Sequence, residues 1–366
     1  MARISPNGRV RRTPFSDGVE AAGVKGYTVY NHMLLPTVFE SFEADYHHLK
    51  RHVQVWDVAC ERQIQVKGPD ALRMIQFLTP RDLDKMTADR CLYIPVVDAM
   101  GGMLNDPVLM QAAPDTYWIS IADSDLLLWI EGFACTQGFD AEVSEVDVSP
   151  LAVQGPKSDD LMARVFGDGV RALRFFSCGR FGFEGRPTLI SRSGYSKQGG
   201  FEIYVEGTEN GMTLWNALFA AGEDLNVRAG CPNLIERIEG GLLSYGNDMT
   251  RENTPLECGL GRFVDASQLD HCFGGRALKE ELAEGSKQMI RPIAIEGDIP
   301  PCDRVWPVYA DGKRVGQVKS AVWSPDHKIN VAMGMIARTH WDTGTAIEVE
   351  TQDGMRSATV QEKFWR

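Results

Sequence analysis

The chain has 366 residues, of which 43% are hydrophobic and 24% charged, and this balance is typical of a globular protein with two or three packed units. Its net charge of −12 disfavours a nucleic-acid surface. No run approaches the roughly 18 apolar residues needed to span a bilayer, and the N-terminus lacks the apolar core of a signal peptide. We therefore expect a cytoplasmic protein that binds neither nucleic acid nor membrane.

The eight cysteines are scattered without a Cys-x-x-Cys pair, and the seven histidines are dispersed without carboxylates at ligand spacing. This distribution predicts neither a metal site nor a disulfide framework, and it favours reduced thiols.

Residues 27–36 are predicted to be a short apolar strand or loop with aromatic and polar members interleaved. Tyr30 in this segment is a possible pocket residue, and the alternative is a core segment with a few polar tips. Helical periodicity over residues 37–52 then gives way to strand character over residues 53–59.

A repeated pattern of strand, Gly-Pro and helix suggests an internal duplication. A clean alternating strand at residues 63–67 precedes Gly-Pro and an amphipathic helix that ends at residue 78. The same order returns over residues 151–165. Two related α+β halves, each with an antiparallel sheet, are the most economical architecture.

Between the two copies, residues 93–109 predict a strand, a Gly-Gly turn and a second strand that is interrupted at Asp106 and Pro107. Proline removes a ladder donor and so marks an edge or a bulge. Asp106 is therefore either a surface turn residue or a carboxylate that points into a cavity, and the spacing does not decide between them. Residues 117–122, which include Trp118, predict the next strand and a core segment.

A glycine-rich loop leads into a strand over residues 193–206. Apolar residues alternate on one face of this strand, while Glu202 and Tyr204 share the other face, and Tyr195 lies on the loop just before them. These polar side chains could form a wall for a flat, hydrogen-bonding heterocycle. The alternative is an ordinary antiparallel strand with its polar face in water.

Two further helices are predicted at residues 208–224 and 232–245. Arg237 lies at the margin of the apolar face of the second, either as a surface arginine or as a partly buried donor. An aperiodic polar loop follows over residues 245–260, and loops of this length usually serve a site. Past about residue 286, short strands and turns predict a small barrel-like all-β unit.

Four motifs resemble those of the folate-dependent aminomethyltransferase family, which includes the T-protein of glycine cleavage. Residues 101–106, Gly-Gly-Met-Leu-Asn-Asp, resemble the Gly-Gly-Ile-x-Asp-Asp of that family. The stretch from Gly194-Tyr195 to Gly-Phe-Glu202 resembles its Gly-Tyr-Thr-Gly-Glu-Asp-Gly-Phe-Glu. Residues 237–248 with Thr-Pro-Leu-Glu at 254–257 resemble its Arg-x-Glu-Ala-Gly-x-x-x-Tyr-Gly-x-Asp with Thr-Pro-x-Glu.

The resemblance implies the three-lobed T-protein fold with a central folate channel. Residues 1–285 would form the folate-binding region from two interleaved α+β subdomains, and residues 286–366 the C-terminal barrel. Other segments, including Ser-Lys-Gln-Gly-Gly at 196–200 and Cys-Pro-Asn at 231–233, resemble the family members that demethylate dimethylsulfoniopropionate. The implied reaction transfers a methyl group from this small molecule to tetrahydrofolate.

The resemblance also implies roles for individual residues. Asp106 would be catalytic, and Tyr195, Glu202 and Arg237 would bind the folate. A sulfonium cation also favours aromatic faces, so Tyr204, Tyr30 and Trp118 are candidates to surround the methyl donor. Lys197 is a candidate partner for the carboxylate of the donor.

Two departures leave the methyl donor open. Tyr195 stands where the demethylases are expected to carry Trp, and the stretch at residues 175–180 also diverges. Dimethylglycine, a betaine or an aromatic methyl ether are alternative donors, and a glycine cleavage-type aminomethyltransferase or a folate-binding accessory protein are alternative functions. The sequence does not fix the oligomeric state, and a homodimer is compatible with it.

Overall fold

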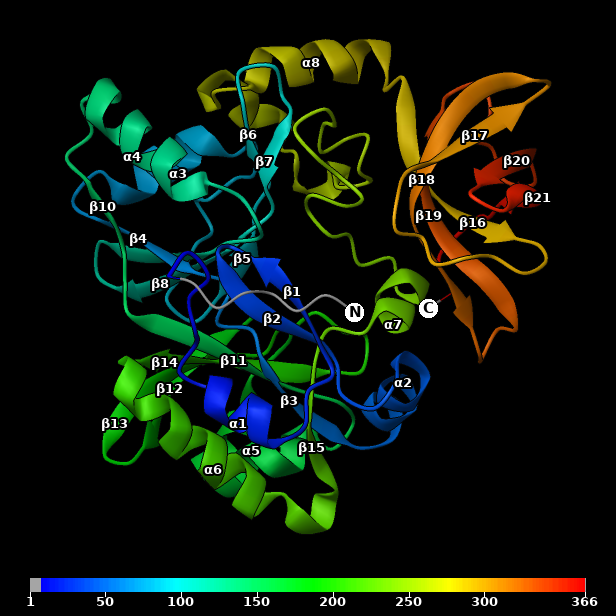
Figure 1. Ribbon diagram of the computed structural model, residues 1–366. Helices are drawn as coiled ribbons and strands as arrows, with labels where there is room; N and C mark the ends of the chain where they lie inside the picture. The colour runs from blue at the N-terminus through cyan, green and yellow to red at the C-terminus, as the bar shows by residue number, and fades with distance from the viewer. Residues whose placement is uncertain (1–7, 366) are drawn as a thin grey trace. The chain divides into compact units, whose positions relative to one another are not determined.

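The computed structural model describes residues 8–365, which form two compact units (Figure 1). The first unit contains the residues through Ala71, Met86–Leu92 and Val108–Asn233. The second contains Leu72–Lys85, Tyr93–Pro107 and the residues from Leu234 onward. None of the helices in the described residues is long and apolar enough to cross a membrane.

The first unit contains two mainly antiparallel sheets, a hairpin and several helices. Its helices are α1 (Ser16–Ala21), α2 (Phe42–Arg51), α4 (Leu126–Gln137), α5 (Ser158–Phe166) and α6 (Gly211–Ala221). Its strands are β1 (Gly26–Tyr30), β2 (Met33–Val38), β3 (Val53–Asp57), β4 (Gln63–Lys67), β5 (Cys91–Tyr93), β8 (Val108–Ala113), β9 (Thr116–Ser120), β10 (Glu142–Glu145), β11 (Val148–Gln154), β12 (Cys178–Phe183), β13 (Arg186–Ser191), β14 (Gly200–Glu206) and β15 (Val227–Gly230). Helix α3 (Ala71–Leu78) begins at the boundary of this unit.

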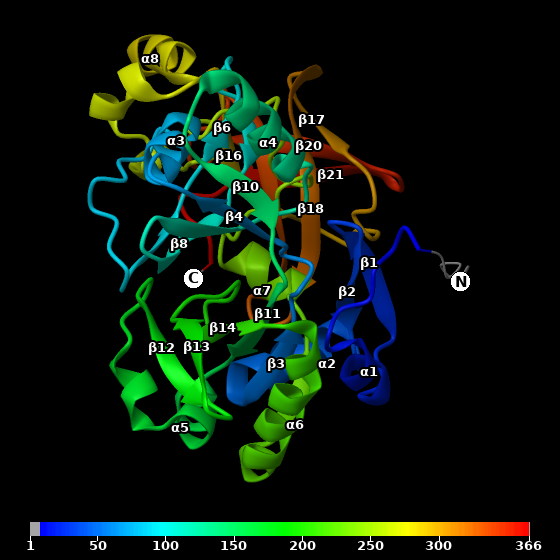
Figure 2. The same ribbon diagram turned by 90° about the vertical axis from the view of Figure 1, so that its left-hand side faces the viewer.

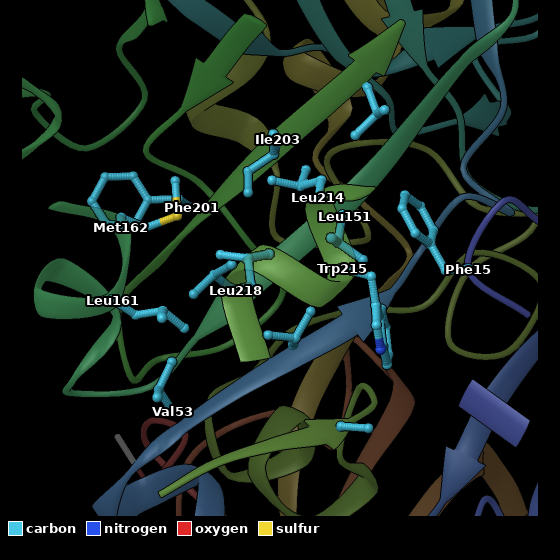
Figure 3. Packing of buried hydrophobic residues seen from close by; sticks show 14 of the residues in the cluster. Phe15, Val53, Leu151, Leu161, Met162, Phe201, Ile203, Leu214, Trp215 and Leu218 are labelled. Atoms are coloured by element: carbon cyan, nitrogen blue, oxygen red, sulfur yellow. The ribbon is translucent and has the colours of Figure 1, made fainter. Parts of the chain in front are cut away.

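The six-stranded sheet of the first unit has the order β12-β13-β14-β11-β3-β15. Helices α5 and α6 pack on one face of it, as Figure 3 shows for Leu161 and Leu218 beside Phe201 and Ile203. The strand alternation that the sequence predicts for residues 201–205 is thus confirmed on its apolar face, because all three apolar side chains of β14 lie in this core.

The five-stranded sheet, in the order β10-β4-β9-β8-β5, meets the other face of the six-stranded sheet (Figure 2). Trp118 and Met110 of the five-stranded sheet pack in one buried cluster with Leu189 and Tyr204 of the six-stranded sheet. The interpretation of the Glu202 and Tyr204 face as solvent-facing is therefore wrong: these residues are 7% and 0% exposed, because the second sheet covers their strand.

The second unit contains a closed barrel, in the order β16-β19-β18-β17-β20-β21, as the sequence predicts. The strands of this unit are β6 (Val96–Val97), β7 (Met103–Asn105), β16 (Gln288–Ile295), β17 (Trp306–Ala310), β18 (Lys313–Ser324), β19 (Ile329–Ala337), β20 (Ala346–Thr351) and β21 (Gly354–Val360). Its helices are α7 (Leu234–Glu239) and α8 (Gly275–Glu284). Closure leaves no free strand edge within the barrel, and Val308, Val318 and Ile336 fill its interior.

Two local predictions are corrected. The helix expected over residues 232–245 is only α7, which ends before Gly240 and Gly241. Gly241 has φ +66°, in the left-handed region, so the apolar periodicity continues through residues that are not helical. The strand or loop expected over residues 27–36 is a hairpin of β1 and β2, and residues 37 and 38 extend β2 rather than begin the next helix.

The end of α7 provides a test of this packing. A Cβ atom at Gly241 would lie 2.5 Å from the Phe364 ring, whereas a Cβ at Gly312, with φ +71°, would meet nothing within 4 Å. Both alanine substitutions carry left-handed strain of about 1–2 kcal/mol, and only Gly241→Ala adds a steric overlap. We expect Gly241→Ala to lower the urea midpoint clearly more than Gly312→Ala. Equal losses would show that the Phe364 contact adjusts without cost.

Candidate functional site

The glycine-rich loop before β14 is held by the end of β11. Gln154 donates to the Ser193 carbonyl at 3.2 Å and accepts a hydrogen bond from the Ser196 hydroxyl at 2.7 Å. A Cβ atom at Gly194 would lie 2.0 Å from the Gln154 amide nitrogen, so only glycine permits this close approach. The loop is therefore fixed directly in front of the strand that carries Glu202.

Glu202 lies in a cross-strand row in which Ala152 faces it on one side and Ser191 on the other. One of its carboxylate oxygens, Oε2, accepts hydrogen bonds from the Ser193 hydroxyl and, at 3.5 Å, from the Tyr204 hydroxyl. The Ser191 and Ser193 hydroxyls are 2.5 Å apart and continue this network. Among the described residues, nothing donates a hydrogen bond to the other oxygen, Oε1.

Burial raises the pKa of Glu202, while the hydrogen bonds from Ser193 and Tyr204 oppose that rise. A buried carboxylate with one unoccupied oxygen has the desolvation cost of burial without full compensation. This arrangement suits an incoming ligand that supplies N–H donors.

The two aromatic residues expected beside the methyl donor, Tyr204 and Trp118, lie in the same cluster between the two sheets of the first unit. The Trp118 indole donates to Gln65 at 3.2 Å, and burial raises the pKa of Tyr204 well above its ordinary value. Tyr30 is half-buried at the end of β1, outside this cluster. The structure thus brings together two of the three aromatic candidates.

Tyr195 packs against a separate buried cluster that includes Trp56 and Ala152. It is half-buried, whereas Lys197 on the same loop is exposed. A cavity of about 40 Å³ borders the loop and is also lined by Phe175 and Arg192. Phe175, the first residue of the divergent stretch at 175–180, therefore lies beside the glycine-rich loop, although this cavity is too small for a folate.

Asp106, in the second unit, follows β7 directly. Its Oδ2 atom accepts a hydrogen bond of 2.8 Å from the Tyr93 hydroxyl, and its buried Oδ1 atom has no hydrogen-bond partner among the described residues. Burial raises the pKa of Asp106 to about 7, and the negative charge of Asp248 adds to this rise. Asp106 as a whole is half-buried, but its unpartnered Oδ1 atom is buried, so it is not a solvated surface turn carboxylate.

Arg237 is a buried donor rather than a surface arginine. Its guanidinium pairs with Asp248 at 2.8 Å and donates to the Ser320 hydroxyl of β18 at 2.7 Å. Ser320 in turn donates to Asp248 at 2.5 Å. Arg237 thereby fixes the polar loop at Asp248 to Ser320 within strand β18 of the barrel, and both oxygens of Asp248 are occupied.

The groups that hold these residues are not apparent from the sequence motifs. Ser193 and Tyr93 each occupy one oxygen of a candidate carboxylate, and Ser320 completes the Arg237 network. Ser193 begins the glycine-rich segment at residues 193–206 and could have been found from it. Tyr93 lies in the same segment as Asp106, residues 93–109, but no motif pairs the two residues. Ser320 is 83 positions from Arg237 along the chain, so no local pattern points to it.

Comparison with known families agrees with this geometry. The sequence model of the GCVT N-terminal domain matches residues 15–268, and that of the glycine cleavage T-protein C-terminal barrel domain matches residues 292–365. The chain belongs to the glycine cleavage T-protein family. It is an enzyme of this transferase family, as the sequence predicts, and the predicted T-protein fold is confirmed.

Individual relatives refine this assignment. The chain is 64% identical to the protein of Ruegeria pomeroyi named dimethylsulfoniopropionate demethylase DmdA, over 100% of both chains. It is 29% identical to the aminomethyltransferase of Bacillus pumilus, over 96% of this chain and 97% of that one. The glycine cleavage system aminomethyltransferase T of Bartonella henselae has the same fold, with a TM-score of 0.86 and 22% identity over 98% of both chains.

The raised pKa of Asp106 predicts a pH-dependent stability change on neutralisation. The unfolded Asp pKa is about 3.9 and the folded one about 7, so the folded wild type binds more protons between these values. Its stability relative to Asp106→Asn therefore falls as pH rises from about 4 to 7, and then stays constant. We therefore expect the urea midpoint of Asp106→Asn to rise relative to that of wild type between pH 5 and pH 8.

Urea unfolding at several pH values measures this difference. The exposed Asp84→Asn controls for the loss of a carboxylate in the same unit. A pH-independent difference for Asp106→Asn would contradict the buried, half-compensated carboxylate.

Proposed function

We propose that this T-protein family member is a tetrahydrofolate-dependent methyltransferase that demethylates dimethylsulfoniopropionate. The products are methylthiopropionate and 5-methyltetrahydrofolate. The observation that carries the proposal is the 64% identity, over the whole of both chains, to the relative named for this demethylation. The aminomethyltransferases are only 27–29% identical, which favours demethylation over a glycine cleavage-type reaction.

The proposed methyl transfer requires little chemical activation by the protein. A sulfonium methyl is already activated, because a neutral thioether leaves when the methyl is transferred. Bound tetrahydrofolate supplies the nitrogen that accepts the methyl group. The main task of the protein is positioning for direct in-line transfer, which can contribute roughly 7–11 kcal/mol.

Glu202 is the proposed partner of the folate pterin. Its Oε1 atom has no donor among the described residues, and a carboxylate is the best acceptor for pterin amino and ring N–H groups. Ser193 holds Oε2 and so fixes the direction in which Oε1 accepts. The carboxylate oxygen without a donor supports this assignment, because the pterin supplies N–H groups.

Asp106 is the proposed catalytic group beside the reacting nitrogen. Its buried Oδ1 atom has no hydrogen-bond partner among the described residues and can accept the proton that the nitrogen loses after methylation. A pKa of about 7 suits a group that takes up a proton near neutral pH. Tyr93 orients the carboxylate through Oδ2.

The remaining candidates have supporting roles in the proposal. Tyr204, Tyr30 and Trp118 would stabilise the sulfonium cation through their aromatic faces, each by about 0.5–2 kcal/mol. Lys197 would pair with the donor carboxylate, and Tyr195 would pack beside the folate. Arg237 would act on folate binding through the Asp248 loop that its guanidinium holds. A cytoplasmic location and a homodimer stay predictions.

The proposal predicts that purified protein converts dimethylsulfoniopropionate and tetrahydrofolate to both products in equal amounts. Mass spectrometry of complete reactions, and of reactions that omit each component in turn, measures them. Folate binding without either product would reject this donor. Dimethylglycine, a betaine and an aromatic methyl ether, tested with the same folate readout, would then identify the donor that the Tyr195 loop accepts.

Substitution of Glu202 tests the folate assignment. Glu202→Gln keeps the side-chain shape and removes the charge, and hydrogen bonds to charged groups contribute about 1.5–3 kcal/mol, so we expect the dissociation constant of tetrahydrofolate to rise about 10-fold to 100-fold. Isothermal titration calorimetry measures this change. The matched control is Glu206→Gln, an exposed glutamate on the same strand. Unchanged affinity in Glu202→Gln would remove Glu202 from the folate site.

A further inference from the structure

Glu61, in the first unit, is a half-buried carboxylate that the proposed roles above do not use. It lies in the loop between β3 and β4. Its Oε2 atom accepts a hydrogen bond of 3.4 Å from the Ser120 hydroxyl at the end of β9. A hydroxyl donor leaves the negative charge of Glu61 in place, so the carboxylate can still attract a cation.

Gln63 and Ser120 determine the direction of this carboxylate. Gln63 is the partner of Ser120 in the β4–β9 ladder, and its amide nitrogen donates to the Glu61 carbonyl at 2.6 Å and to the Ser120 hydroxyl oxygen at 2.8 Å. Because that oxygen accepts a hydrogen bond from Gln63, the hydroxyl proton of Ser120 is directed to Glu61. The carboxylate is therefore held against the end of β9.

The end of β9 connects Glu61 to two aromatic candidates for the methyl donor. Trp118 and Ser120 are two positions apart on β9 and so share one face of the strand. Trp118 packs in one buried cluster with Tyr204. Burial raises the pKa of Tyr204 well above its ordinary value, and the negative charges of Glu202 and Glu61 act in the same direction. The charge of Glu61 is therefore felt within the aromatic cluster.

The hairpin of β1 and β2 brings the third aromatic candidate to the same loop. Asn31, which follows Tyr30, donates to the Cys60 carbonyl at 3.0 Å and to the Ala122 carbonyl at 3.1 Å. Cys60 directly precedes Glu61, and Ala122 lies just beyond the end of β9. The loop of Glu61 thus lies next to the hairpin tip that carries Tyr30.

A carboxylate near aromatic faces suits a small organic cation. Aromatic faces attract an onium group, but they also pack well against a neutral apolar group of the same shape. A carboxylate attracts only the cation, and the attraction is screened less where the carboxylate is partly buried. The charge of Glu61 can therefore separate ligands that the aromatic rings separate poorly.

We propose that Glu61 is a specificity residue that selects positively charged onium methyl donors over neutral donors of the same shape. The inference rests on the proposed function for the place of the donor beside Tyr204, Tyr30 and Trp118. It narrows the set of donors that the sequence leaves open, because an aromatic methyl ether has no charge for Glu61 to attract.

The test uses two pairs of ligands, each with the same shape and the same carboxylate but a different charge at one atom. Dimethylsulfoniopropionate is compared with 4-methylpentanoate, and 3-(trimethylammonio)propionate with 4,4-dimethylpentanoate. Isothermal titration calorimetry without a methyl acceptor measures the dissociation constants. We expect wild type to prefer the cation, and we expect this preference to fall about 10-fold in Glu61→Gln, because a half-buried charge is screened less than an exposed one.

Two controls accompany the variant. Glu142→Gln removes an exposed glutamate of β10, in the same sheet as β9, and should retain the preference for the cation. The affinity of Glu61→Gln for tetrahydrofolate should equal that of wild type, which also shows that the variant is folded. In turnover, the substitution should raise KM for the donor more than it lowers kcat, because the donor is already charged when it binds.

Three results would overturn the inference: no binding of either cation, equal affinities within both pairs in wild type, or an unchanged preference in Glu61→Gln. A preference for the trimethylammonio compound alone, reduced in Glu61→Gln, would support the role of Glu61 and reject dimethylsulfoniopropionate as the donor. Because the binding measurement needs no methyl transfer, failure of the specificity residue is distinguishable from failure of the proposed function.

Discussion

The cost of burying a carboxylate determines how the polar groups of this protein are arranged. Glu202 and Asp248 are buried, Asp106 is half-buried with one buried oxygen, and these three carboxylates show two different solutions. Asp248 is fully compensated, because Arg237, Ser320 and the Ser244 amide occupy both of its oxygens. Glu202 and Asp106 are each held by hydroxyl donors at one oxygen only, among the described residues. A carboxylate with hydrogen-bond donors at both oxygens indicates a structural role. A carboxylate with donors at one oxygen only leaves the other oxygen as an acceptor for a ligand.

The strand that carries Glu202 shows what the sequence can and cannot predict. Alternation over residues 201–205 identifies correctly which side chains share a face, because successive strand residues point to opposite sides. It does not identify what covers each face. The polar face of β14 is buried because Trp118 and Met110 come from a different sheet, and no pattern within β14 contains that information.

The same limit explains the other differences. The apolar positions of α7 continue with helical spacing past residue 239, yet Gly241 ends the helix locally and packs against Phe364. The sequence motif located Asp106 in front of Pro107, but its partner Tyr93 comes from 13 positions earlier in the chain. The candidate site residues are thus recognisable from motifs, whereas the groups that orient them are seen only in the folded chain.

The raised pKa of Asp106 has a consequence for the proposed reaction. A carboxylate with a pKa of about 7 is only partly ionised at neutral pH before the donor binds. A cation within about 4–6 Å lowers the pKa of a carboxyl group by roughly 1–3 units, so a sulfonium beside Asp106 would ionise it. After transfer the thioether is neutral, and the pKa of Asp106 returns toward 7. The carboxylate would therefore be ionised when it attracts the donor and most basic when the methylated nitrogen must lose its proton.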